Sequence, residues 1–286
     1  MAKRSREEGP ADRRKKFRFS SGTLEPCVSG IYATCSRKHE KQAAQELGIL
    51  FQEKLEEYYA NELSSLNKNE AGDQNSEELS VEDQIKKELE ALRSKPKGHK
   101  NKEILKFIDL NCECVIFCKT RSPIVPEVFV HKLMEEFSDP KSLQKRTRYV
   151  QKLTPITFSC NASLSELEKL CDKVLKPHFH MDNGVNYTFA IEITRRNFNT
   201  IDKMELIQKV ASAVGKGGKY NHKVDLKNYD KLILVECFKN NIGMSVVDSD
   251  YREKFKKYNI QQIFEAKFKD QKENTEAAEK QITKKK

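Results

Sequence analysis

The fold is decided by the stretch "KRTRYVQKLTPITFSC", residues 145–160, in which cations surround an apolar, strand-like run. Side chains alternate between the two faces of a β-strand, so an extended chain places Arg146 and Arg148 on one face. Lys152 joins them there if no bulge intervenes. Cations on one face repel one another unless a counter-anion such as a nucleic acid phosphate is present. A solvated edge strand whose charges prevent aggregation explains the same spacing, so both interpretations stay open here.

The composition favours a basic protein with parts outside its folded domains. Of 286 residues, 37% are hydrophobic and 34% charged, and the mean hydropathy is −0.75, which is too polar for a single compact globule. Lys and Arg outnumber Asp and Glu by 53 to 43, which favours polyanionic partners. No apolar run approaches the roughly 18 residues of a membrane span, and the amino terminus is charged. We therefore expect a soluble, intracellular protein that does not bind membranes.

The sequence shows no motif of catalytic or metal chemistry. The glycine cluster "GKGGK" at 215–219 lacks the frame of a phosphate-binding loop. "HFH" at 178–180 could begin a metal site, but no carboxylate or cysteine motif at ligand spacing accompanies it. Several of the eight cysteines lie in strand-like apolar runs, where reduced cysteine behaves as a small buried hydrophobe. We expect reduced cysteines and no metal site, and the balance shifts from catalysis toward binding.

The first half of the chain predicts a small α/β module. Residues 1–20 form a basic arm that we expect to be disordered. Residues 21–140 form the module, and Asp139 and Pro140 mark its end. An acidic segment without periodicity, about residues 61–103, interrupts it as a flexible insertion. Its strand and helix patterns lie at 30–36, 37–60, 107–120 and 126–137.

The second half alternates strand and helix patterns again, so the fold class is α/β, in the α+β sense. The domain covers residues 141–249, with strand patterns at 148–160, 186–194, 222–226, 230–238 and 242–248. Helical patterns start at 163 and 202; the first ends before Pro177 and the second is terminated by glycine. We expect a basic amphipathic helix at 250–268 and a disordered charged tail at 269–286.

Two further clusters in this domain combine cations with amide side chains or glycine. In "TRRNFNT", 194–200, Arg195, Arg196 and Asn197 stand between a strand and a helix, where they could meet phosphates and sugar hydroxyls. A turn at the asparagine, with Thr200 capping the next helix, is a compatible structural interpretation. Lys216 and Lys219 in the glycine turn either contact phosphate or only increase solubility.

Several stretches together resemble a known family. In the second half they are "RYVQKLTPITFSC", "FAIEITRRNFNT", "HKVDLKNYDKLILVECFKNNIGMSVV" and "KKYNIQQI", and in the first half "SGIYATCSRKHEKQAAQEL" and "FIDLNCECVIFCKT". They are similar to the eukaryotic THUMP-domain adaptors of tRNA acetylation, over about residues 20–265. By this resemblance the second domain is a THUMP domain that follows an N-terminal α/β module.

The resemblance implies a protein that is not an enzyme and has no cofactor of its own. THUMP domains bind tRNA, and this family is required for N4-acetylation of cytidine in the D-arm of serine and leucine tRNAs. A separate RNA cytidine acetyltransferase, using acetyl-CoA and ATP, performs the chemistry on the tRNA that the adaptor presents. The resemblance also implies a nuclear protein, expected in the nucleolus, with the cytoplasm as the other possible location.

The resemblance turns the cationic clusters into candidate tRNA contacts. In the THUMP half these are Lys145, Arg146, Arg148, Lys152, Arg195, Arg196, Asn197, Lys216 and Lys219. In the first module, Arg37 and Lys38 at the start of the first helix extend this surface or dock the enzyme. The apolar side chains of residues 149–156 then lead into the THUMP core.

Two other functions remain as alternatives. The first is an RNA-modifying enzyme with its own catalysis, although only about 39 residues (248–286) follow the last strand and a catalytic domain takes roughly 100 or more. The second is a protein-only scaffold whose basic surfaces bind acidic partners, and such a scaffold would not prefer tRNA over other polyanions.

Overall fold

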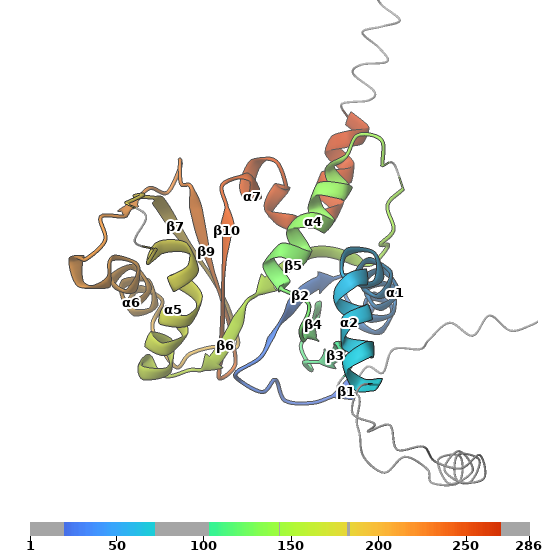
Figure 1. The fold of residues 1–286 in the computed structure, drawn as a ribbon, viewed down its shortest axis with the longest axis horizontal. Helices are drawn as coiled ribbons and strands as arrows, with labels where there is room; N and C mark the ends of the chain where they lie inside the picture. Colours follow the sequence, from blue (N-terminus) through green and yellow to red (C-terminus); the bar gives the residue numbers. More distant parts are fainter. Residues whose placement is uncertain (1–19, 72–102, 143, 182–183, 270–286) are drawn as a thin grey trace, which may run out of the picture.

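The computed structural model describes residues 20–71, 103–142, 144–181 and 184–269, which form two five-stranded sheets with helices packed against them (Figure 1). The strand order is β1-β3-β4-β2-β5 in the first sheet and β6-β10-β9-β7-β8 in the second. The predicted mixed α/β class is confirmed. The predicted arm at 1–20 and tail at 269–286 lie, apart from one residue each, outside the described residues.

The first sheet consists of five strands that lie between residues 20 and 156. Its strands are β1 (Ser20–Ser21), β2 (Ser29–Cys35), β3 (Leu105–Asp109), β4 (Val115–Thr120) and β5 (Val150–Ile156). Its helices are α1 (Glu40–Tyr58), α2 (Ala60–Ala71) and α4 (Pro126–Ser138). The apolar stripes of α1 and α4 are buried against one face of this sheet, because Leu47, Phe129 and Ile31 belong to one core cluster.

Residues 107–120, predicted as one strand, form the β3–β4 hairpin instead. The two strands pair antiparallel with Phe107 opposite Cys118. The chain reverses through Asn111 and Cys114, whose φ angles are 49° and 64°. Leu110, only 1% exposed, follows β3 directly and precedes Asn111. The apolar run therefore extends into the turn, which makes the turn hard to recognise in the sequence.

The second sheet has α5 (Leu164–Phe179) and α6 (Lys203–Gly215) on one face. Its strands are β6 (Phe158–Asn161), β7 (Thr188–Arg196), β8 (Lys223–Val224), β9 (Lys231–Phe238) and β10 (Asn241–Asp248). Both helices begin at capping residues, because Ser163 Oγ accepts from the Glu166 N–H and an Asp202 carboxylate oxygen accepts from the Met204 N–H. Parallel β7 and β9 are linked through α6, as βαβ geometry requires.

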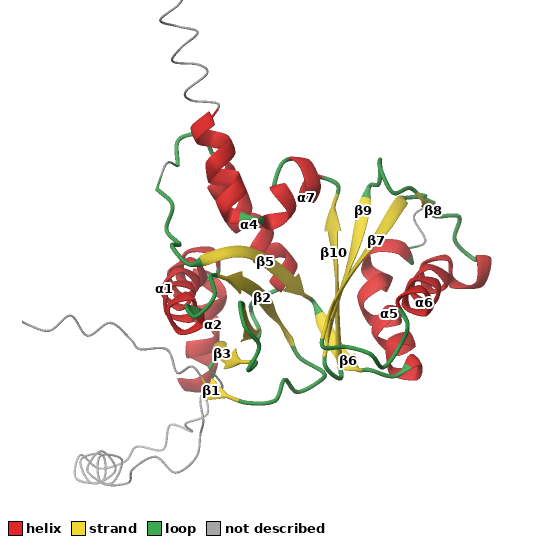
Figure 2. Ribbon diagram, turned by 180° about the vertical axis from the view of Figure 1, so that it is seen from behind, coloured by secondary structure: helices red, strands yellow, loops and turns green. Residues whose placement is uncertain are grey.

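The position of β5 corrects the predicted domain boundary. Residues 141–249 were predicted to form one domain, but β5 pairs with β2 in the first sheet, with Gly30 opposite Ile156. After Thr157 the chain enters the second sheet as β6. At this crossing the Thr157 N–H donates to the Met244 carbonyl at 3.0 Å, and Ser245 Oγ donates to the Pro155 carbonyl at 2.7 Å. The stretch 145–160 therefore joins the two sheets, as the path of β5 into β6 shows in Figure 2.

The two sheets share part of their hydrophobic core. Leu153 of β5 and Leu234 of β9 belong to the same buried cluster. Tyr251, Phe255 and Tyr258, at most 1% exposed, belong to it as well. Because these large aromatic side chains are buried against elements of both sheets, their packing holds the sheets together.

The helix predicted at 250–268 is divided into shorter elements. They are α7 (Asp250–Glu253), the 3-10 turn η2 (Lys256–Tyr258) and a helix at 260–269. Lys257 and Tyr258 both have φ of 58°, which no α-helix accommodates. The buried positions of Phe255 and Tyr258 offset this unfavourable backbone.

Two other predicted boundaries are also wrong. The insertion predicted at 61–103 starts later, because α2 continues to Ala71, and residues 72–102 lie outside the described residues. Helix α5 continues past Pro177 to the buried Phe179, where the His180 N–H closes the last turn on the Lys176 carbonyl. Helix α6 ends at Gly215, as predicted, and the left-handed residue that caps it is Lys216, with φ of 43°.

All eight cysteines are free thiols, as predicted. Burial raises the pKa of Cys35 and Cys171 to about 12, so both stay protonated at neutral pH. Within the described ranges, no group of three or more His, Cys, Asp and Glu side chains could hold a metal ion. None of the helices in those ranges is long and apolar enough to span a membrane.

We expect Gly243→Ala to destabilise the crossing of the two sheets. A Cβ at this position of β10 would lie 2.8 Å from Ile156 Cγ2 and 2.9 Å from its Cδ1. Overpacking of this kind costs roughly 1–3 kcal/mol of unfolding free energy, which urea denaturation measures. Gly22→Ala is the matched control, because no atom lies within 4 Å of its added Cβ. Equal unfolding free energies of the two variants would show that the stability of the protein does not depend on the close approach of Gly243 in β10 to Ile156 in β5.

Candidate nucleic-acid interface

The cations at 145–152 do not form the predicted strand face. β5 begins at Val150, so Arg146 and Arg148 lie before the strand. Lys152 lies within it. The Arg146 guanidinium instead makes a two-bond ion pair with the Glu53 carboxylate of α1, with Nη1 donating to Oε1 at 2.6 Å. This pairing offsets the positive charge of Arg146 and raises its pKa.

A second carboxylate of α1 fixes the backbone of the same segment. One Glu46 oxygen accepts from the Arg148 N–H at 2.9 Å, and the other accepts from the Tyr149 and Val150 N–H groups at 2.8 Å each. Glu46 and Glu53 are seven residues apart and therefore share one face of α1. Together they hold the start of β5 against the helix.

This anchoring leaves Arg148 next to a pair of stacked rings. The His39 and Tyr149 rings are 4.5 Å apart between centroids and inclined by 15°, and Arg148 Cζ lies 5.5 Å from the Tyr149 centroid. Arg148 is exposed, and both rings are half-buried. Lys145 and Lys38 are also exposed, and within the described part of the chain neither they nor Arg148 form an ion pair.

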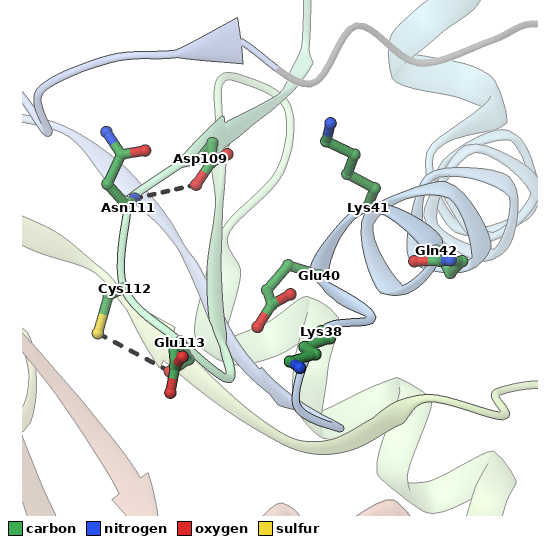
Figure 3. A pocket seen from close by; sticks show the side chains of 8 residues that line it. All are labelled: Lys38, Glu40, Lys41, Gln42, Asp109, Asn111, Cys112 and Glu113. Atoms are coloured by element: carbon green, nitrogen blue, oxygen red, sulfur yellow. Dashed lines mark hydrogen bonds between the residues drawn. The ribbon is translucent and has the colours of Figure 1, made fainter.

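Lys38 also lines a polar hollow at the start of α1, shown in Figure 3. The other lining residues are Glu40, Lys41, Gln42, Asp109, Asn111, Cys112 and Glu113. Arg37, predicted beside Lys38 as a candidate contact, forms an ion pair with Glu113 at 3.0 Å from Nε to Oε2. Glu40 accepts from the Cys114 N–H at 2.8 Å, which lowers the pKa of that carboxyl. The hollow thus mixes both signs of charge and is not a basic pocket.

Arg195 and Arg196, predicted as one pair, point to opposite faces of β7. Arg195 is exposed, and its Nη1 lies 3.5 Å from the Ile201 carbonyl. Arg196 faces the first sheet, where its Nη1 donates to Glu236 Oε2 at 2.6 Å. Asn197 follows in an exposed left-handed conformation, with φ of 50°. Only Arg195 and Asn197 therefore remain open to a partner.

The pair of Arg196 and Glu236 belongs to a polar joint between the sheets. The Glu236 side chain is 5% exposed, and burial raises its pKa despite the opposing effect of Arg196. Lys152 of β5 lies close enough for its charge to affect Glu236, and burial lowers the pKa of Lys152. Lys257 pairs with Glu192 at 3.1 Å at the same joint. Lys152 and Arg196 thus help to join the sheets.

Lys216 and Lys219 are both exposed in the turn after α6. Lys219 Nζ lies 5.1 Å from the Tyr220 ring centroid. The Tyr220 ring stacks on His180, with centroids 5.1 Å apart, and on His222, with centroids 5.9 Å apart. Lys219 therefore borders a column of stacked rings that the sequence did not reveal.

The histidines of this region have structural roles. His180 Nε2 donates to the Ala213 carbonyl at 3.0 Å, while His178 lines a different hollow. The His222 ring accepts from the Tyr187 N–H at Nδ1 and donates to the Phe179 carbonyl from Nε2, so both nitrogens are satisfied. The two imidazoles of "HFH" therefore have different surroundings, in line with the absence of an accompanying ligand motif in the sequence.

Comparison with known proteins places this arrangement in a family. Residues 161–247, from β6 to β10, match the THUMP domain. Over 275 residues the chain is 56% identical to a Saccharomyces cerevisiae protein named tRNA acetyltransferase TAN1, with 93% of this chain and 94% of that protein covered. The chain belongs to the THUMP-domain family of TAN1. A Schizosaccharomyces pombe protein is 34% identical over 262 residues, covering 92% of this chain and 83% of its own length.

A solved structure is similar to the same domain. The solution structure of the THUMP domain of THUMP domain-containing protein 1 is 31% identical to this chain, with a TM-score of 0.27. The match covers 30% of this chain and 85% of the chain in the solved structure. We predicted a THUMP domain at 141–249, whereas the match to the family starts at 161, after β5.

Sequence reasoning missed the acids that pair with the candidate cations. Glu53, Glu113 and Glu236 each lie at least 40 positions from the arginine that they bind. Local spacing carries no signal for such pairs. The seven-residue spacing of Glu46 and Glu53 was a detectable signal for a shared acidic face on α1, although it does not name the partner segment.

We expect the stability contribution of Glu236 to depend on pH. Its folded pKa is raised above the unfolded value, so its contribution is greatest below the ordinary carboxyl pKa of 4.5 and decreases as the pH rises. Glutamine does not titrate. The unfolding free energy of the wild type should therefore fall relative to Glu236→Gln between pH 5 and pH 8, as measured by urea denaturation.

Glu168→Gln is the control for this measurement. Glu168 is exposed, and its hydrogen bond with Lys209 lowers its pKa below the ordinary 4.5, so most of its titration lies below pH 5. Its difference from the wild type should stay constant between the two pH values. A constant difference for Glu236→Gln as well would contradict the raised pKa.

Proposed function

We propose that this protein is a tRNA-binding adaptor for tRNA acetylation. It presents serine and leucine tRNAs to a separate RNA cytidine acetyltransferase, which forms N4-acetylcytidine in the D-arm. The acetyltransferase uses acetyl-CoA and ATP, and the adaptor needs no cofactor. We place this activity in the nucleus, and within it the nucleolus, with the cytoplasm as the alternative.

The observation that carries the proposal is the near full-length match to a protein named for tRNA acetylation. It is supported by the net charge of +10 and by the exposed cations Lys38, Lys145 and Arg148, which form no ion pair with a described acid. The adaptor role and the identity of the tRNAs come from the family resemblance in the sequence.

The structure narrows the residues that we propose as RNA contacts. Arg37 and Arg146 are paired with exposed acids, and Lys152 and Arg196 belong to the polar joint. We propose as RNA contacts the exposed cations Lys38, Lys145, Arg148, Arg195 and Lys216 together with Asn197, and also Lys219, whose Nζ lies 5.1 Å from the Tyr220 ring centroid. They lie on both modules, so one RNA would contact the first sheet and the THUMP domain together.

Catalysis by the protein itself is the second candidate function. It is favoured by the name of the yeast relative, tRNA acetyltransferase TAN1. The two candidates differ in whether a second protein is needed. An adaptor requires a separate acetyltransferase, whereas a catalyst acetylates tRNA by itself.

Reconstitution tests both candidates. We expect acetylcytidine only when this protein, the acetyltransferase, unmodified serine tRNA, acetyl-CoA and ATP are combined, as measured by mass spectrometry of the digested nucleosides. Product formed without the acetyltransferase would establish the second candidate. Product formed equally well without this protein would refute the adaptor role.

Salt dependence of tRNA binding tests the proposed contacts. Each lost phosphate contact should lower the slope of log affinity against log salt by about one, so Arg148→Gln and Arg195→Gln should each have this effect. Arg146→Gln should change the slope little, because Glu53 already neutralises that charge. Fluorescence anisotropy with labelled tRNA at several salt concentrations measures the slopes. A larger change of slope for Arg146→Gln than for Arg148→Gln and Arg195→Gln would contradict the proposed set of phosphate contacts.

A further inference from the structure

We propose that His39 and Tyr149 form a stacking site for an unpaired base of bound RNA, with Lys38, Lys145 and Arg148 contacting the adjacent phosphates. This inference rests on the proposed function. It extends RNA recognition to the first module, outside the residues that match the THUMP domain.

The two rings are held by contacts between distant parts of the chain. The Ser36 N–H donates to the Tyr149 carbonyl at 2.9 Å, which brings the turn before α1 next to the start of β5. His39 Nδ1 donates to the Arg37 carbonyl at 2.8 Å and so fixes the ring plane. Tyr149 packs against the edge of the hydrophobic core. Because the rings are ordered before binding, little conformational entropy is lost when a base stacks on them.

The charges around the rings favour an anionic ligand. Among the described residues, the acids near the rings are engaged elsewhere. Glu46 accepts three backbone N–H groups, and Glu40, next to His39, accepts the Cys114 N–H. Glu53 binds Arg146, and Glu113 binds Arg37. The cations Lys38, Lys145 and Arg148 have no described acid as a partner. A ring stack bordered by such cations is the arrangement with which proteins bind single-stranded nucleic acid.

The site should distinguish unpaired from paired RNA. In a duplex each base is stacked between its neighbours and offers no free face to a side chain, so a duplex can use only the cations. The other ring column, at Tyr220, is a weaker candidate. Both nitrogens of His222 there bind backbone groups, and His180 is buried.

A pair of His39 variants separates stacking from hydrogen bonding. His39→Asn can keep the bond to the Arg37 carbonyl but removes the ring, whereas His39→Phe keeps a ring and loses the bond. We expect His39→Asn to weaken tRNA binding about fivefold or more, as for loss of a stacked base, with an unchanged salt slope. His39→Phe should bind within about twofold of the wild type. Wild-type affinity of His39→Asn, or equal weakening by both variants, would overturn the proposal.

A tryptophan reporter tests the preference for unpaired RNA directly. The protein contains no tryptophan, so His39→Trp introduces a single fluorophore. A 12-nucleotide single-stranded RNA should quench its fluorescence. The 12-base-pair duplex made from that strand and its complement should not, at concentrations where anisotropy shows both to be bound. Equal quenching by both RNAs, or none by either, would overturn the stacking site.

The controls separate this inference from the proposed function and from folding. Arg252 lies 5.6 Å from the Tyr229 centroid, much as Arg148 lies beside Tyr149, but Tyr229 is buried. Arg252→Gln should therefore leave binding of the single strand unchanged, while Arg148→Gln should weaken it. If wild-type protein fails to bind tRNA, the proposed function fails. If it binds and His39→Asn, with an unchanged thermal melt, binds equally well, only the stacking site fails.

Discussion

The rest of the structure depends on the crossing of β5 into β6, where one continuous segment belongs first to one sheet and then to the other. The crossing is held by backbone and hydroxyl hydrogen bonds from Thr157 and Ser245 and by the contact of Gly243 with Ile156. Only glycine allows β10 to approach Ile156 so closely. With this point fixed, the aromatic side chains of the C-terminal segment can pack against both sheets at once.

The crossing also divides the basic side chains into two groups. Those near it, Lys152 and Arg196, face the space between the sheets, where burial requires an opposite charge, and Glu236 supplies it. Those on the outer turns, such as Arg148 and Arg195, stay in contact with solvent. Position relative to the crossing therefore determines whether a cation holds the modules together or is open to a polyanion.

The sequence predicted features that depend on local periodicity and failed where distant contacts decide. The helix predicted at 126–137 and the strand at 230–238 agree closely with α4 and β9, because α4 buries a regular apolar face and β9 is buried along almost its whole length. The prediction of a strand face at 145–152 was wrong because Glu46, more than 100 residues earlier in the chain, accepts hydrogen bonds from the backbone of that segment. The helix predicted at 250–268 is interrupted where Lys257 and Tyr258 adopt positive φ angles and the Tyr258 ring is buried in the core that both sheets share. In the candidate site the cations could be found from their spacing, but their partners could not.

The pairing of β2 with β5 has a consequence for synthesis of the chain. Ser29 Oγ of β2 donates to the Thr157 carbonyl, 128 residues later in the sequence. At a translation rate of about 5–20 residues per second, the edge of β2 waits roughly 6–25 seconds for its partner to leave the ribosome. An unpaired edge of this kind can pair with other chains. The nascent first module is therefore most exposed to aggregation before the THUMP domain begins to emerge, and a chaperone that covers β2 would act in that interval.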